Sequence, residues 1–557
     1  MSENINNNLP DDKNGVEPIS NNNINTDFST TIEKSPKKDN KKLLMIIAAL
    51  IVIGAMVAAI GFLSNPKVKI AKALAGVPTE FTNTLNDFAP EIAFGNIINT
   101  SYETGVSDMQ SKLTITYANL NGGKPITIDF ITKNNPKAKK SAMNFNFDLG
   151  GVNFATDMIA LGDEFYFNAP SLYSKPLKLN LKTLGQDLAS SPAKADLENT
   201  GAEVDENLSV DFYATPNSNK ELEDGFKKYA KVEIDTLTKN MKVEKVKVAD
   251  TYSSDLTTLG RAAKEVTAYE LTIKASDIKA LLNKTVDYNA KVQQDKFDSL
   301  YDSFKSETDS QKEQINSMDL PETVTSTVLI EDKKLIGVIF NNEEENSDIK
   351  IYLAGKLNTT DKIAIIATDE NEQSANVIEM QNTKDLKTIN ILSNEHAAAD
   401  ALKNVKPVNE ITNTGDVITI KNVKNSKSYD INLSEIKTGK AFRAKFEQIP
   451  VEVDGYKLMD FSGEIFVGIE SPEITAPENP QDLLKMDEKS YEKFKTELVD
   501  NSKKIGAQFM FKLTTGGNIP DEASSIGIIG GADGPTAIRI KKWIYKRWHN
   551  AAKIWFW

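Results

Sequence analysis

The sequence predicts an α+β protein in which one N-terminal transmembrane helix is followed by a β-rich, antiparallel, extracytoplasmic region with long helices packed on its sheet. Three observations support this fold class. An uncharged apolar stretch lies near the N-terminus, apolar residues alternate with polar ones over most of the chain, and a few segments show helical periodicity. A chain of 557 residues has room for all of these elements.

Composition excludes several classes of function. The net charge of −13 disfavours nucleic acid as a partner of the main body, because an acidic surface repels phosphates. The chain has no cysteine, which excludes disulfides, thiolate nucleophiles and Cys-ligated metal sites. It has only two histidines, His396 and His549, so most Ser-His-Asp and multi-His arrangements are excluded as well. We expect no cofactor.

The N-terminal region predicts a membrane anchor. Residues 1–42 are polar and asparagine-rich, and we interpret them as a disordered cytoplasmic tail. Residues 43–63 carry no charge and, at ~1.5 Å per helical residue, are long enough to span a bilayer core of ~30 Å. Five lysines precede this stretch within ten residues and only three follow it closely, so we expect the tail to be cytoplasmic and the bulk of the chain extracytoplasmic.

Period-two alternation predicts two β-rich blocks, residues 67–320 and 321–513. In the first block, apolar residues alternate with polar ones over three successive stretches, at residues 113–117, 126–130 and 143–149. This pattern is typical of antiparallel strands with one solvent-exposed face. The residues Asn121-Gly122-Gly123 predict a hairpin turn between the first two of these strands. In the second block we expect strands at residues 336–340, 349–353, 363–367, 417–420 and 463–469.

Two helices are expected between these strands. Phe226, Ala230, Ile234 and Leu237 share one face of a helix that starts near Lys220. A second, longer helix is expected to be capped by Ser276 and to continue, with or without a break, to residue 304. We interpret both apolar stripes as packing against the sheet rather than as a cofactor site.

The C-terminal region differs from the rest of the chain. Residues 514–523 read as a linker, and the segment SSIGIIGGADGPTAI follows at residues 524–538. This segment resembles the GGADGPT signature of the β subunits of sodium ion-translocating decarboxylases of the oxaloacetate decarboxylase type. The resemblance implies a sodium site at Asp533 and association with a decarboxylase complex. Under this interpretation a sodium ion would be the only cofactor. A Gly-rich turn is the alternative interpretation.

The remainder of the segment 524–557 combines positive charge with all four tryptophans of the protein. Basic residues interleaved with tryptophans are typical of the headgroup region of a bilayer. We expect contact with a membrane surface or a partner through the following residues: Lys541, Lys542, Trp543, Lys546, Arg547, Trp548 and Trp555. A helix or strand that closes the β-rich region is the alternative.

Other candidate chemistry is sparse. Carboxylates at residues 343–345, 361 and 369–370 lie in expected loops, and paired carboxylates can hydrolyse glycosides only at a defined separation. We expect His396 to lie in a surface loop. No residue is predicted to be catalytic.

Three hypotheses for function follow from these observations. The first is a single-pass, non-enzymatic surface protein, bound to the bilayer through residues 43–63, which binds an envelope protein or an apolar ligand. The arrangement is loosely similar to the half-barrel sheets of bacterial envelope proteins. The second is a component or partner of a sodium ion-translocating decarboxylase, acting through residues 524–538. The third is an envelope hydrolase that uses carboxylates.

Overall fold

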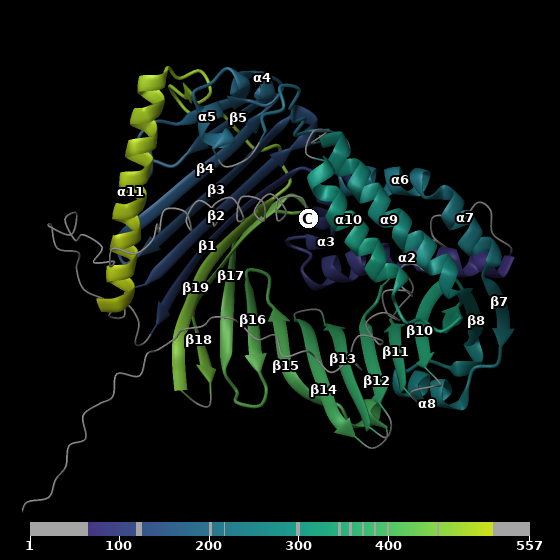
Figure 1. Ribbon diagram of the computed structural model, residues 1–557. Helices are drawn as coiled ribbons and strands as arrows, with labels where there is room; N and C mark the ends of the chain where they lie inside the picture. The colour runs from purple at the N-terminus through teal and green to yellow at the C-terminus, as the bar shows by residue number, and fades with distance from the viewer. Residues whose placement is uncertain are drawn as a thin grey trace, which may run out of the picture.

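The computed structural model describes residues 65–515, apart from short gaps at residues 118–124, 200–202, 215, 217, 297–300, 343–346, 356–358, 370–371, 384–385, 398–399 and 454–455. In this part of the chain one sheet of 20 strands dominates the fold, and helices pack on its faces (Figure 1). The β-rich character that alternation predicts is therefore confirmed.

The strands fall into two groups along the chain. The first group is β1 (Ser107–Tyr117), β2 (Ile126–Asn135), β3 (Lys140–Leu149), β4 (Val152–Leu161), β5 (Glu164–Asn168) and β6 (Leu177–Asn180). The second group begins with β7 (Lys242–Val246), β8 (Val266–Lys274), β9 (Thr323–Glu331), β10 (Lys334–Asn342), β11 (Ser347–Ala354), β12 (Lys362–Asp369) and β13 (Glu372–Asn382). It continues with β14 (Lys387–Ala397), β15 (Lys406–Asn413), β16 (Val417–Asn422), β17 (Ser428–Lys437), β18 (Ala441–Val453), β19 (Tyr456–Gly468) and the short β20 (Gln481–Asp482).

The pairing of these strands is almost entirely sequential. From β7 to β19 each strand pairs antiparallel with the next one in the chain. Strand β19 then pairs with β1, and the order continues through β2, β3, β4, β5 and β6. Strand β20 adds to β6 in parallel. The pairing of β1 with β19 joins the two groups of strands in one continuous sheet, and the pairing of β8 with β9 also links the two expected β-rich blocks.

The helices lie between and after these strands. They are α2 (Asn65–Phe88), α3 (Phe94–Thr104), α4 (Leu184–Ala189), α5 (Ala193–Glu198), α6 (Asn219–Tyr229), α7 (Lys231–Asn240), α8 (Asp250–Thr258), α9 (Ala275–Lys296), α10 (Tyr301–Asn316) and α11 (Glu488–Thr515). Short 3-10 turns are η3 (Pro136–Ala138), η4 (Ala263–Glu265) and η6 (Ala401–Asn404).

The predicted helices are present with two differences. The stretch near Lys220 forms α6 and α7, with Ala230, Ile234 and Leu237 buried as expected. The longer helix starts at Ala275, so Ser276 lies inside its first turn rather than at its cap. It is followed by a separate helix, α10, that folds back on α9: Lys279 near the start of α9 donates to the carbonyl of Met318, just after the end of α10, at 2.7 Å.

The expected fold class needs one correction, which concerns the predicted transmembrane helix. Within the part of the chain described, none of the helices is both long enough and apolar enough to cross a bilayer. The longest, α11, carries lysine and glutamate along its length. Residues 43–63, where the span was predicted, and the tail 1–42 lie outside the described residues.

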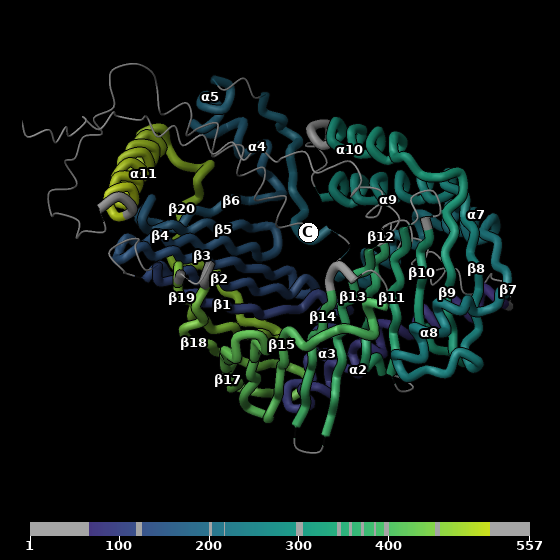
Figure 2. The backbone as a smooth tube through the Cα atoms, turned by 90° about the horizontal axis from the view of Figure 1, so that it is seen from below, coloured from purple at the N-terminus to yellow at the C-terminus, as the bar shows by residue number. Residues whose placement is uncertain are grey.

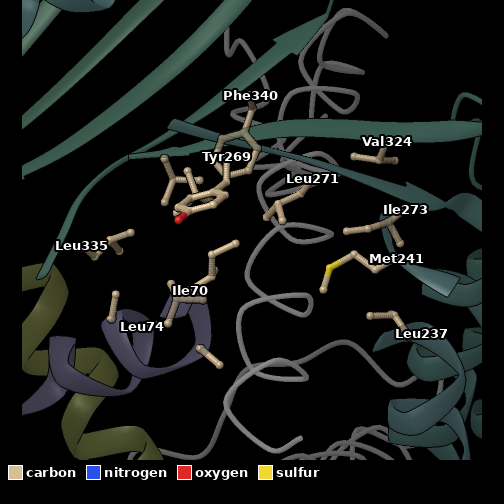
Figure 3. Packing of buried hydrophobic residues seen from close by; sticks show 14 of the residues in the cluster. Ile70, Leu74, Leu237, Met241, Tyr269, Leu271, Ile273, Val324, Leu335 and Phe340 are labelled. Carbon is tan, nitrogen blue, oxygen red and sulfur yellow. The ribbon is translucent and has the colours of Figure 1, made fainter. Parts of the chain in front are cut away.

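The largest core lies where α2, α7 and α9 pack on β8 to β11. Figure 3 shows Ile70 and Leu74 of α2 on one side of this core, and Leu237 of α7 with Met241, which directly follows α7, on the other. The strand residue Leu271 lies among the side chains between them. A second core lies on the opposite face of these strands, beneath α8 and η6. This half of the sheet is therefore covered on both faces, and Figure 2 shows the same helices and strands from below.

A buried tyrosine predicts how stability depends on alkaline pH. Tyr213 is 8% exposed, its hydroxyl donates to the carbonyl of Ala160 at 2.8 Å, and burial raises its pKa to about 12. An unfolded tyrosine loses its proton near pH ~10, so the stabilisation is complete below that pH and is lost between about pH 10 and 12, at up to ~1.4 kcal/mol per pH unit. We expect Tyr213→Phe to reduce the loss of the free energy of unfolding between about pH 10 and 12, measured by urea unfolding; other tyrosines with a raised pKa, such as Tyr166, keep part of that loss. Tyr429→Phe, at a half-buried position of β17, is the control, and equal pH dependence in both variants would contradict the assignment.

Candidate binding surface

One face of the sheet carries a continuous row of apolar side chains across eight strands. The strand registers place the following residues side by side: Ile418, Ile431, Phe446, Gly463, Leu113, Ile128, Phe147 and Phe154. We call the part of this face on β19, β1, β2 and β3 the apolar face. Besides members of the row, it includes Phe461, Ile465, Met109, Ile115, Phe130 and Phe145.

Among the residues that the structure describes, helices pack on this face at its two ends. At one end α3 packs on β18, where the rings of Phe94 and Phe442 meet edge to face with centroids 5.7 Å apart. At the other end α11 reaches β3, where Phe509 lies 5.5 Å from Phe147, ring centroid to ring centroid. In Figure 1, α11 and α3 accordingly lie on either side of strands β1 to β4.

The side chains between these two ends are not part of a closed core. Met109 and Ile465 are 39% and 38% exposed, and Leu113, Ile128 and Phe130 are half-buried. None of these five belongs to the four hydrophobic clusters found among the described residues. Folded proteins seldom leave contiguous apolar surface of this kind without a binding role.

The opposite face of these strands, which continues onto β4 and β5, is polar and carries hydrogen bonds between neighbouring strands, although one oxygen of Asp129 is buried without a partner. Asn144 and Asn168 donate to the two carboxylate oxygens of Asp157 at 2.7 and 2.9 Å, and Asn146 donates to Asp129 at 3.2 Å. Cross-strand hydrogen bonds of this type stabilise the sheet without needing a covering layer. The two faces of these strands therefore have different roles: the polar face meets water, and the apolar face is left for a contact.

A glycine keeps the apolar row continuous where β18 meets β19. A Cβ at Gly463 would lie 2.5 Å from the ring of Phe446, so the ring occupies the space above the glycine. Any larger residue at position 463 would have to displace that ring. Glycine in a strand often marks such a close approach.

Charged groups within this half of the sheet sit on the polar face or at its edges. Arg443 pairs with Glu464 and with Glu435, and its guanidinium lies 5.2 Å from the ring of Phe466. Burial and a hydrogen bond to Glu164 raise the pKa of Tyr166 on β5 to about 12. Along the paired stretches of β19, β1, β2 and β3, the apolar face itself presents no charged side chain, so it suits an uncharged surface or chain.

The candidate residues that were named from the sequence and that the structure describes lie on or beside β12 and β14, away from this face. Asp533 and the basic and tryptophan residues at positions 541–555 lie outside the described residues, as do residues 343–345 and 370. The prediction of a surface loop at His396 is wrong, because the residue lies within β14. Asp361 lies just before β12, and its backbone carbonyl accepts from the amide of Met380 at 2.6 Å. Among the residues described, His, Asp and Glu form no group of three or more able to hold a metal ion.

Sequence patterns identified three of the four strands of the apolar face, and they did not show that β19 lies beside them. The alternation at residues 113–117, 126–130 and 143–149 identified its β1, β2 and β3 residues as the apolar side of antiparallel strands. Phe461 and Ile465 alternate in the same way on β19, but nothing local shows that β19 pairs with β1. No protein-family model matches this chain, and a search of curated proteins finds no match.

Proposed function

We propose that this chain is a non-enzymatic binding protein whose apolar face takes an uncharged, apolar ligand of the acyl-chain type. The observation that carries the proposal is the set of half-buried and exposed apolar side chains on β19, β1, β2 and β3, opposite a polar face that is hydrogen-bonded within itself. Apolar contact area supplies the free energy of such binding, at about 25 cal/mol per Å² removed from water.

The shape of the surface supports a chain-like ligand. Neighbouring strands are ~4.8 Å apart, so the four strands of the apolar face offer a strip about 15 Å wide, and the row of apolar residues extends further at both ends. A flat strip lined by aromatic and branched aliphatic side chains can contact an extended hydrocarbon chain along its length. It offers no cation at its centre to fix a charged headgroup, so specificity for a headgroup would have to come from its edges.

The test uses two variants of adjacent residues on β2. Ile128 lies on the apolar face and Thr127 on the polar face, and Ile128→Lys and Thr127→Lys introduce the same charge on the same strand. Binding of a fatty acid with an environment-sensitive fluorophore is titrated against the full chain. We expect Ile128→Lys to weaken binding about tenfold or more, equivalent to ~1.4 kcal/mol, and Thr127→Lys to leave it unchanged.

Two results would overturn the proposal. One is equal affinity in both variants, which would place the ligand elsewhere. The other is concentration-dependent self-association, measured by light scattering and lost in Ile128→Lys, because that result would assign the face to a second copy of the chain.

A further inference from the structure

We propose that Lys350 and Asp255 form an intramolecular isopeptide bond, an amide between their side chains that joins β11 covalently to α8. Asp348 carries the proton that this reaction moves. The chain has no cysteine, so an amide of this kind supplies the covalent cross-link that disulfides supply in other proteins. The site lies between α8 and the sheet, beside the second core, so the inference is independent of the ligand proposed for the apolar face.

The side chain of Lys350 is buried between β11 and α8. Alternation along β11 places it on the same face as Tyr352; the side chain of Lys350 is 6% exposed and Tyr352 is 0% exposed. Helix α8 covers this face with Leu256, which is also 0% exposed, and with Tyr252, whose ring centroid lies 5.9 Å from Nζ of Lys350. These apolar and aromatic groups exclude most water from the amine, and hydrolysis of an amide formed there would need that water.

Two carboxylates meet the amine of Lys350. Its Nζ lies 3.4 Å from Oδ2 of Asp255 and 3.5 Å from Oδ2 of Asp348. Groups held about 3–3.5 Å apart in a fixed orientation react at effective concentrations far above any that solution allows. The carboxyl carbon of Asp255 is bonded directly to Oδ2, so rotation about the last bonds of the lysine side chain brings the amine to that carbon.

Tyr352 selects Asp255 as the carboxyl group that is attacked. Its hydroxyl donates to Oδ2 of Asp255 at 2.8 Å. Burial and the nearby charge of Asp255 raise the pKa of Tyr352, so the hydroxyl keeps the proton that it donates. A donor at this oxygen stabilises the negative charge that develops on it when the nitrogen attacks the carbon.

Asp348 is suited to carry the proton. Its Oδ2 faces the ammonium of Lys350, and its Oδ1 is buried without a hydrogen-bond partner among the described residues. A carboxylate in this position can take a proton from the ammonium and give it to the oxygen that leaves Asp255. Asp348 is therefore a general base in the first half of the reaction and a general acid in the second.

The reaction balances without any further reactant. A bond between the nitrogen of Lys350 and the carboxyl carbon of Asp255 replaces one carbon–oxygen bond. Two hydrogens from the ammonium and one oxygen from the carboxylate leave as one water molecule, and Asp348 ends in the state in which it began. One positive and one negative charge become a neutral amide, which removes the cost of holding two ions away from water.

Mass spectrometry of the full chain tests this inference directly. We expect the protein to be lighter than its sequence by the mass of one water molecule, and Lys350→Arg, which keeps the positive charge, to have its full sequence mass. Trypsin should release residues 248–261 and 335–356 as one joined peptide, since it cannot cleave after a modified Lys350. Asp348→Asn should leave most chains at full mass, because general acid–base catalysis contributes about 10²–10⁴-fold to such a step.

The mass of the unaltered chain decides the question even if a variant fails to fold. A chain at its full sequence mass would overturn the inference, as would a water loss that peptide mapping places elsewhere. Lys334 and Glu80, a buried pair 3.1 Å apart, are the internal control, and we expect them to stay ionic. Complete cross-linking in Asp348→Asn would contradict the role given to Asp348.

Discussion

Replacing Glu80 by alanine should lower the free energy of unfolding by about 3–5 kcal/mol, because it removes the carboxylate that pairs with the buried ammonium of Lys334. Lys334 lies 3.1 Å from Glu80, and the two side chains are 4% and 10% exposed. The hydroxyl of Thr360 also donates to Glu80 at 3.0 Å, and the Thr360 amide donates to Thr84 at 2.8 Å. This cluster joins α2 to β10 and to the loop before β12, so its loss should loosen α2 from the sheet.

Urea unfolding followed by far-UV circular dichroism measures this effect. In the double variant Glu80→Met, Lys334→Met neither charge of the pair remains, and we expect most of the stability to return. Glu198→Ala is the surface control, since Glu198 faces Lys194 at 3.9 Å with both side chains exposed, and should change stability by less than about 1 kcal/mol. If Glu80→Ala and Glu198→Ala unfolded at the same urea concentration, the cluster would have no structural role.

Replacing Leu237 by alanine should cost about 2–5 kcal/mol, the range for emptying a well-packed core site. Leu237 on α7 is 0% exposed and lies in the cluster that joins α2, α7 and α9 to β8–β11. Because that cluster holds three helices on one sheet face, the surrounding side chains cannot collapse into the space without moving a helix.

A matched control lies on the same helix. Val232 is 72% exposed, and Val232→Ala should shift the free energy of unfolding by less than about 0.5 kcal/mol in the same urea experiment. A Leu237→Ala variant as stable as Val232→Ala would show that the α7 contact contributes little to the fold.

The sequence predicted local structure better than it predicted arrangement. The strands at residues 113–117 and 363–367 were predicted from their alternation, and the helix was predicted from the apolar stripe through Ile234 and Leu237. These predictions succeed because a strand or helix with one buried face repeats apolar residues at a fixed local spacing. The separation of α9 and α10 was harder to foresee. Both segments are polar with short apolar stripes, and the break between them is accompanied by packing of Lys279 against the end of α10.

The apolar face could not be predicted as a site. Leu113 and Ile128 have the same pattern whether a helix covers them or not, and only the three-dimensional arrangement shows that α3 and α11 stop at either end. The pairing of Leu113 with Gly463 could not be predicted from the sequence either, because these two residues lie far apart along the chain. The carboxylates stand out in the sequence through their number. In the structure, however, residues such as Glu464 and Glu470 are paired with arginine or lysine.

The junction of β1 with β19 also has a consequence for how the protein is made. Strand β1 is synthesised before strands β2 to β18, and its neighbour β19 emerges from the ribosome only after all of them. Until then the edge of β1 that does not pair with β2 presents unpaired amides and carbonyls beside an apolar surface, a combination that favours aggregation of nascent chains. Such a long-range junction slows folding, so newly made molecules should depend on chaperones that shield the first strands during translation.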